Sequence, residues 1–175
     1  YTSSAILSPT DSSSSISKSL QSYAGLAGLA GINLPSNSED NNAAKGIQKL
    51  NSLSFFENSI MPNIYLPNLM ALRSWDHKTN NLNYKNKDYD KKTETWIRDY
   101  SYPQKQIPSA QESFEVFKEK HFTLVEDRKT GFISLNISHK SPFIAKKWVE
   151  LMISEINTFY RQKDKADSSK AITYL

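Results

Sequence analysis

Three histidines are the first residues in this chain whose side chains could bind a metal ion or transfer a proton. They lie at positions 77, 121 and 139, and no pair of them has the short spacing of a helical metal site. The chain contains no cysteine, so thiolate ligands and a cysteine nucleophile are both excluded. His139 has an ordinary pKa range near neutrality, but its place just before Ser141 and Pro142 favours a surface or helix-capping role over catalysis. We therefore predict no metal site and no cofactor.

Four carboxylates form the next group with potential chemistry, because a glycosidase needs two carboxylates facing one cleft. They are Asp88, Asp90, Glu94 and Asp99, and they stand among Lys and Asn in a strongly polar stretch. The neighbouring lysines balance their charge, so a solvated surface explains them without catalysis. The chain also lacks a Gly-x-Ser-x-Gly elbow that would present a serine nucleophile. We expect no catalytic residue and no enzymatic activity.

The same polar stretch carries residue types that bind sugars or bases, namely aromatic rings beside cations. The rings belong to Tyr84, Tyr89, Tyr100 and Tyr102, and the cations are Lys85, Lys87, Lys91, Lys92 and Arg98. The alternative is a long surface loop over 76–105, held down by its aromatic residues with Trp96 and Ile97 as its strong anchors. Both interpretations remain open from the sequence.

Composition and charge restrict the class of partner. The chain has 22 Lys and Arg against 18 Asp and Glu, a net charge of +4, and the two signs are interleaved. Without a basic stripe, no nucleic-acid partner is expected. A length of 175 residues suits one folded domain.

The ends of the chain suggest a fragment of a longer protein. The chain begins at Tyr1 without Met and stops at Leu175 inside a helical pattern. It contains no apolar run of the roughly 18 residues that cross a bilayer, and no signal peptide. Membrane segments of the parent protein would therefore lie outside this fragment.

The first part of the chain is predicted to contain a strand followed by helical segments. Ser54 and Glu57 form a capping-box pattern that predicts a short helix through Ile60, ended by Pro62. Three glycines over 25–31 indicate either an irregular segment or a packing surface. In order, we predict a strand over 2–8, a helical pattern over 16–34 and a helix over 43–53.

The sequence signals for secondary structure are clearer after Pro108. Ser109 and Glu112 form a second capping box for a helix that carries Phe117 on its apolar face and ends near His121. Alternating apolar residues over 132–138 follow an extended segment over 122–126 and turn residues over 127–131. This pattern predicts a β-hairpin with one buried face.

A long helix is predicted to begin at Ser141, a good N-cap, and Pro142, which suits the first helical position. Its apolar stripe comprises Ile144, Trp148, Leu151, Met152, Ile156 and Phe159. Beyond 160 the stripe fades, although neither Pro nor Gly stops the helix. A helix through Leu175 would span roughly 50 Å. We predict a base domain over 1–160 and a projecting arm over 161–175.

The start of the predicted arm is strongly charged. Two interpretations are open for the charged residues Arg161, Lys163, Asp164 and Lys165. They form either a solvated face or a contact that aligns this helix with another subunit.

The order of several features along the chain resembles one protein family. The features are Trp75, Trp96, Pro108, Ser109, Glu112, Phe117, Thr130, Gly131, Ser141, Pro142, Ala145, Trp148 and Asn157. Together they are similar to the Wzz-type polysaccharide chain-length determinants, the polysaccharide co-polymerases, in the first part of their periplasmic domain.

The resemblance implies an α+β base domain, with a small mixed sheet packed against helices, and a long projecting C-terminal helix. It implies an inner-membrane protein of a Gram-negative bacterium, with this part periplasmic and the flanking transmembrane helices absent from the fragment. The partners it implies are further copies of the same chain and a Wzy-type polymerase, with the growing glycan as an additional candidate. Its implied role is non-catalytic regulation of O-antigen, lipopolysaccharide or related glycan chain length.

Two other functions remain open from the sequence. The first is the periplasmic domain of a bacterial tyrosine autokinase for capsule or exopolysaccharide export, which shares the base-domain pattern. The second is a glycan-binding module that uses the aromatic and basic stretch over 84–102.

Overall fold

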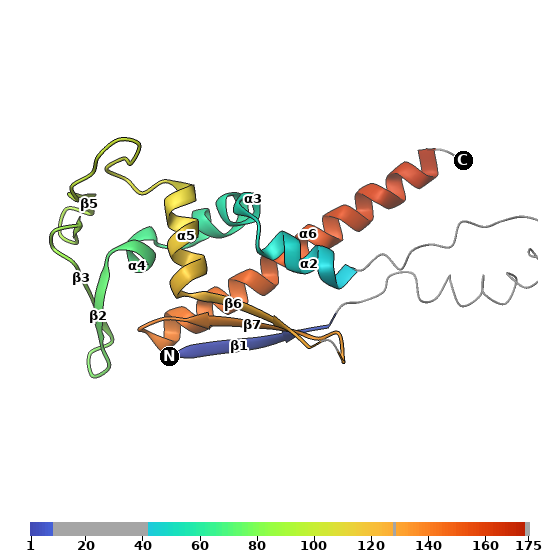
Figure 1. Ribbon diagram of the computed structural model, residues 1–175, viewed down its shortest axis with the longest axis horizontal. Helices are drawn as coiled ribbons and strands as arrows, with labels where there is room; N and C mark the ends of the chain where they lie inside the picture. Colours follow the sequence, from blue (N-terminus) through green and yellow to red (C-terminus); the bar gives the residue numbers. More distant parts are fainter. Residues whose placement is uncertain (9–41, 128, 174–175) are drawn as a thin grey trace, which may run out of the picture.

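The computed structural model describes residues 1–8, 42–127 and 129–173 (Figure 1). The helical pattern predicted over 16–34, with its three glycines over 25–31, lies outside these residues. Among the described residues, the main strands are β1 (Thr2–Leu7), β2 (Leu72–Asp76), β3 (Asn81–Tyr84), β6 (Phe122–Glu126) and β7 (Ile133–Ser138). The principal helices are α2 (Asn42–Leu50), α4 (Leu66–Met70), α5 (Ala110–Lys120) and α6 (Pro142–Thr173).

The central sheet has the strand order β1-β7-β6 and is covered by helices, so the predicted α+β class is confirmed. Both pairings are antiparallel, and the described strands contain no parallel pair of the kind a mixed sheet requires. Leu135 in the middle strand lies opposite Ala5 on one side and Leu124 on the other. The predicted hairpin between β6 and β7 is present, and Gly131 in its turn has a φ of 72°, which favours glycine.

Alternation along β7 gives the sheet one buried face. Ile133, Leu135 and Ile137 are at most 4% exposed, whereas the residues between them are half-buried. Period-two alternation of this kind is what a strand with one face on the core requires. The face of the hairpin that carries Ile133, Leu135 and Ile137 is therefore buried, as predicted.

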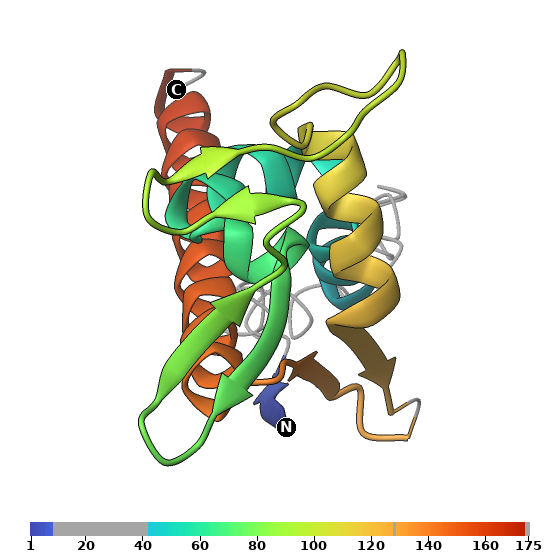
Figure 2. The same cartoon turned by 90° about the vertical axis from the view of Figure 1, so that its left-hand side faces the viewer.

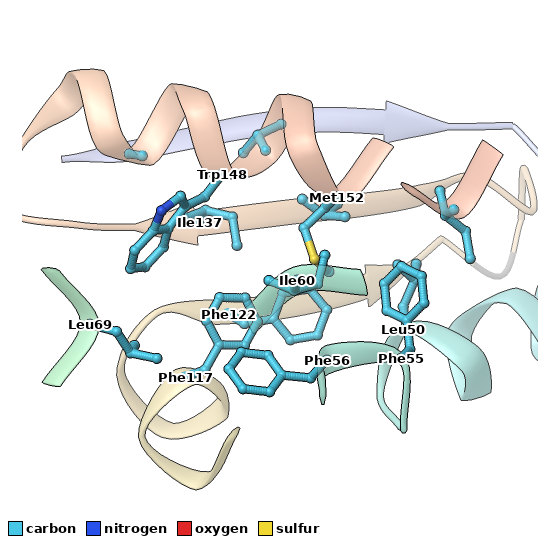
Figure 3. Packing of buried hydrophobic residues seen from close by; sticks show 14 of the residues in the cluster. Leu50, Phe55, Phe56, Ile60, Leu69, Phe117, Phe122, Ile137, Trp148 and Met152 are labelled. Atoms are coloured by element: carbon cyan, nitrogen blue, oxygen red, sulfur yellow. The ribbon is translucent and has the colours of Figure 1, made fainter. Parts of the chain in front are cut away.

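The long helix α6 packs its first four turns on that face of the sheet. Trp148, Met152 and Ile156 are at most 4% exposed and meet Phe117 and Leu50 in one core (Figure 3). The helix begins at Pro142 as predicted, and the Ala145 N–H donates to the Ser141 carbonyl oxygen at 3.1 Å. This bond puts Ser141 at the N-cap position.

A short helical corner covers the other end of the core. It consists of α3 (Leu53–Phe55), a π-helical turn (Phe56–Ile60) and a 3₁₀ turn (Met61–Asn63) that contains Pro62. The predicted cap at Ser54 is wrong, because Ser52 has the extended backbone and its hydroxyl accepts from the Phe55 N–H at 3.2 Å. Ser54 lies inside the first turn, two residues too late to cap it.

The stretch after β2 is folded, which contradicts the predicted surface loop. The strands β2 and β3 pair, as do β4 (Tyr89–Asp90) and β5 (Thr95–Trp96), and the buried side chains between them are Ala71, Leu72, Tyr84 and Tyr89. Ile97 is 48% exposed and does not anchor the stretch. The predicted role of the aromatic residues is present, because Tyr84, Tyr89 and Trp96 supply the apolar contacts of this stretch. We call residues 71–96 the strand lobe.

Candidate functional site

An open polar groove of about 450 Å³ lies on the strand lobe. Its lining residues are Arg73, Ser74, Leu82, Asn83, Tyr84, Asn86 and Lys91. Lys91 Nζ donates to the Leu82 carbonyl oxygen at 3.1 Å and lies 5.7 Å from the centre of the Tyr84 ring. Amide, guanidinium and ammonium groups gathered in one groove can hydrogen-bond a polyhydroxyl or anionic ligand. None of the lining residues supplies a carboxylate or imidazole for acid–base chemistry.

Four aromatic residues support the wall of this groove. Tyr84 Oη donates to Asn68 Oδ1 at 2.7 Å, and the hydroxyls of Tyr65 and Tyr89 share a hydrogen bond. The rings of Tyr89 and Trp96 are 5.2 Å apart, edge to face. Burial, together with the Tyr65 hydroxyl, raises the pKa of Tyr89 above its ordinary range.

Stacking on sugars or bases, one of the two interpretations left open by the sequence, does not fit two of the tyrosines. Tyr84 is 8% exposed and Tyr89 only 2% exposed, so neither ring presents a face to solvent. Tyr100 and Tyr102 are 55% and 97% exposed, but they lie outside the lining of the groove. The strand lobe therefore carries a polar groove beside buried tyrosines, without an exposed stacking surface formed by Tyr84 and Tyr89.

Two of the histidines that are distant in the sequence meet in the structure. The rings of His121 and His139 are 5.5 Å apart, and the Trp148 ring packs edge-on against both. His121 Nδ1 donates to the Ser138 carbonyl oxygen at 2.7 Å. His139 Nε2 faces the Asn68 carbonyl oxygen at 3.2 Å and must carry the proton, because a carbonyl only accepts.

This cluster corrects the surface placement predicted for His139, which is 4% exposed, while the helix-capping role is present. Burial lowers the pKa of both His139 and His121. In the described part of the chain no three His, Asp or Glu side chains gather in a way that could hold a metal ion. The cluster joins the ends of α5 and β7 to the start of α6.

Glu112 has a different role from the predicted one. The Ser109 hydroxyl accepts from the Glu112 N–H at 3.2 Å, which is half of a capping box. The Glu112 side chain instead pairs with Arg98, whose Nη2 lies 2.9 Å from Oε2 and whose Nη1 bonds the other oxygen. Arg98 Nε also donates to the Gln106 carbonyl oxygen, so the pair ties the 97–107 segment to α5. The guanidinium lowers the pKa of Glu112.

Most of the remaining family-like residues are structural. Pro108, Phe117, Ala145 and Trp148 are buried, Ser141 and Pro142 begin α6, and Thr130 and Gly131 form the β6–β7 turn. Only a few lie toward solvent: Asn157 is exposed, and Trp75 and Trp96 are half-buried. Most of these residues are therefore helix caps, turn residues or core residues of the fold.

The charged residues predicted as an oligomer contact lie on the distal half of α6. The side chains of Arg161, Lys163 and Lys165 are exposed, and Arg161 Nη2 donates to Thr158 Oγ1 at 3.3 Å within the helix. The side chain of Asp164 lies outside the described part. No described helix has both the length and the apolar character needed to cross a membrane.

Comparisons of the chain with protein-family models, curated proteins and solved structures gave no match.

Proposed function

We propose that this chain is a non-catalytic, oligomeric regulator of polysaccharide chain length that acts with a Wzy-type polymerase. The observation that carries the proposal is the two-part character of α6. The half up to Tyr160 packs on the sheet and on α2, where the Tyr160 hydroxyl lies 3.2 Å from the position a Cβ on Gly46 would take. The described side chains from 161 onward are exposed.

A helix of this length can hold several copies of the chain together. Its 32 residues extend roughly 48 Å, and its distal end runs past the other described elements (Figure 1). Long solvated helices are rarely stable alone, since tertiary packing supplies most of helical stability. Copies of α6 side by side would cover the distal half and set a fixed spacing between subunits.

The family resemblance connects this architecture to glycan length. A ring of copies would present a fixed number of docking positions to the polymerase or the growing chain. Deleting the gene for this protein in its host should change the modal number of glycan repeats on a gel. An unchanged ladder would contradict the proposal.

A tyrosine-autokinase parent would share this base domain. The sequence of the full parent protein distinguishes the two, because a kinase adds several hundred cytoplasmic residues with a nucleotide-binding loop. A short tail after the second membrane helix supports the regulator.

The polar groove favours glycan binding as a second function. Titration with the cognate repeat-unit oligosaccharide should change Trp96 fluorescence, because Trp96 packs on Tyr89 behind the groove wall. Lys91→Gln should weaken binding, whereas Lys92→Gln on the adjacent exposed residue serves as the control. Equal affinities of the two variants, or no response in the wild type, would count against the groove.

A further inference from the structure

The polar groove on the strand lobe is lined by residues from two hairpins. The first hairpin consists of β2 and β3 and the second of β4 and β5, and Figure 2 shows the green first hairpin below the yellow-green second one. Lys91 belongs to the β4–β5 turn, and its Nζ donates to the Leu82 carbonyl oxygen on β3 at 3.1 Å. The packing of the two hairpins therefore fixes the position of one cation in the groove.

A bulge in β2 brings a second cation to the groove. The pairing of β2 with β3 shifts its register between Leu72 and Ser74, so that Arg73 is the extra residue. Successive side chains of a regular strand point to opposite faces, whereas a bulge re-aims one of them, and both Arg73 and Ser74 line the groove. The bulged backbone is held by Lys140, whose Nζ donates to the Arg73 carbonyl oxygen.

Neither cation of the groove is neutralised by a carboxylate. Among the described residues, Arg73 and Lys91 form no ion pair, and the Arg73 guanidinium forms no hydrogen bond. Asp76 and Asp90 accept backbone N–H bonds in their own turns, and Asp88 pairs with a neighbouring lysine at 3.7 Å. No acidic side chain lines the groove, so its two positive charges are available to a ligand.

The hydrogen-bonding groups of the lining fit an anionic ligand better than a neutral sugar. Arg and Lys side chains only donate, whereas a sugar hydroxyl both donates and accepts. The exposed side-chain acceptors in the lining are Ser74, Asn83 and Asn86, and Ser74 Oγ already accepts from Asn83 Nδ2 at 3.4 Å. A carboxylate or phosphate group offers only acceptor oxygens to these donors, and its geometry matches the planar fork of a guanidinium.

We propose that the polar groove binds an acidic sugar, one that carries a carboxylate or a phosphate. Arg73 and Lys91 contact the anionic group, and the amides of Asn83 and Asn86 contact the sugar hydroxyls. This inference rests on the glycan binding proposed above for the same groove and adds the class of sugar that the groove selects.

An NMR titration of the 175-residue chain compares an acidic sugar with its neutral counterpart. Glucuronate should shift the side-chain amide signals of Asn83 and Asn86 and bind about tenfold more tightly than glucose, and added salt should weaken its binding. Equal affinities for glucuronate and glucose would overturn the selection of an acidic sugar while leaving glycan binding at the groove in place. Unchanged amide signals with every sugar would contradict both.

A variant without the bulge cation assigns the selectivity to Arg73. Arg73→Gln removes the charge and keeps the backbone carbonyl that Lys140 binds, so the bulge should remain. Its affinity for glucuronate should fall about tenfold, and its affinity for glucose should not change. The matched control, Arg161→Gln, removes an exposed arginine of α6 and should bind glucuronate like the wild type. Equal losses in the two variants would overturn the role of the groove.

Two phosphate ligands separate the sugar from its anionic group. Glucose 6-phosphate should shift the same amide signals as glucuronate, and inorganic phosphate should bind more weakly because it lacks the hydroxyls that the amides contact. Equal affinities for the two phosphates would overturn the proposal and would assign the groove to a free anion.

Discussion

The backbone N–H of Ser141 donates a hydrogen bond to Nδ1 of His139 at 3.0 Å, one residue before α6 begins. Nδ1 accepts this bond only when it carries no proton, and Nε2 meanwhile faces the Asn68 carbonyl oxygen. The start of the long helix therefore requires a neutral imidazole. Protonation of Nδ1 would place a second hydrogen-bond donor directly opposite the Ser141 N–H inside a buried cluster.

Stability should fall as the pH drops below the ordinary histidine range. The folded-state pKa of His139 and His121 is lowered by burial from the usual 6.5, so the unfolded chain takes up protons first. The free energy of unfolding should be at its full value above about pH 6.5 and decline below it, by at most about 1.4 kcal/mol per pH unit for each group. Urea unfolding between about pH 5 and 8 measures this slope.

Two variants assign that slope to His139. His139→Asn offers an amide oxygen near the place of Nδ1 but does not titrate, so its slope should be shallower than that of the wild type. The matched control is His77→Asn, which removes an exposed histidine that takes no part in the cluster. A wild-type slope in His139→Asn would show that the pH response arises elsewhere.

The Arg98–Glu112 pair should contribute measurably to stability. The two side chains are 12% and 23% exposed, and the guanidinium bonds both carboxylate oxygens. A double-mutant cycle with Arg98→Ala and Glu112→Ala should give a coupling of about 1–2 kcal/mol. The exposed Lys146–Glu150 pair, at 3.7 Å, should couple by no more than about 0.5 kcal/mol. Similar couplings for the two pairs would refute the structural role of Arg98.

The sheet should respond to mutation on one face only. Ile137→Ala removes a side chain with no exposed surface and should destabilise the protein by about 2–5 kcal/mol. Ile6→Ala in the same sheet removes one that is 72% exposed and should cost about 0.5 kcal/mol or less. Chemical denaturation compares them, and a large effect of Ile6→Ala would indicate that this face is covered in solution.

The distal half of α6 should contact another copy of the chain in the assembled protein. Because the chain has no cysteine, Lys163→Cys introduces a single thiol on an exposed helical position. Oxidation of the protein in its host should link it into dimers, whereas Lys118→Cys on the exposed face of α5 should give fewer. Equal crosslinking at both positions would contradict a contact through α6.

Local signals in the sequence predicted the hairpin and the helices of the second half of the chain. The alternation over 132–138, the Ser109 cap and the apolar stripe from Ile144 depend on neighbours three or four residues away or less, and each is present. The Ser54 cap failed because Ser52, two residues earlier, offers the same chemistry with the required extended backbone.

The sites that depend on distant residues were not predictable in this way. Tyr84 and Tyr89 are buried because they pack on each other and on Leu72, a contact that no local pattern reveals. The His121–His139 cluster needs the antiparallel pairing of β6 with β7 to bring the two rings together. The same holds for the polar groove, which the two hairpins of the strand lobe form together.

The modal length of the host glycan tests the central claim most directly. A strain lacking the gene should be complemented with the wild-type protein or with a variant that carries Arg161→Glu, Lys163→Glu and Lys165→Glu. The wild type should restore the modal repeat number, and the charge-reversed variant, although folded and present at equal amounts, should give a shifted or unregulated distribution. A glycan ladder that is the same with the gene, without it and with the variant would contradict the proposed function.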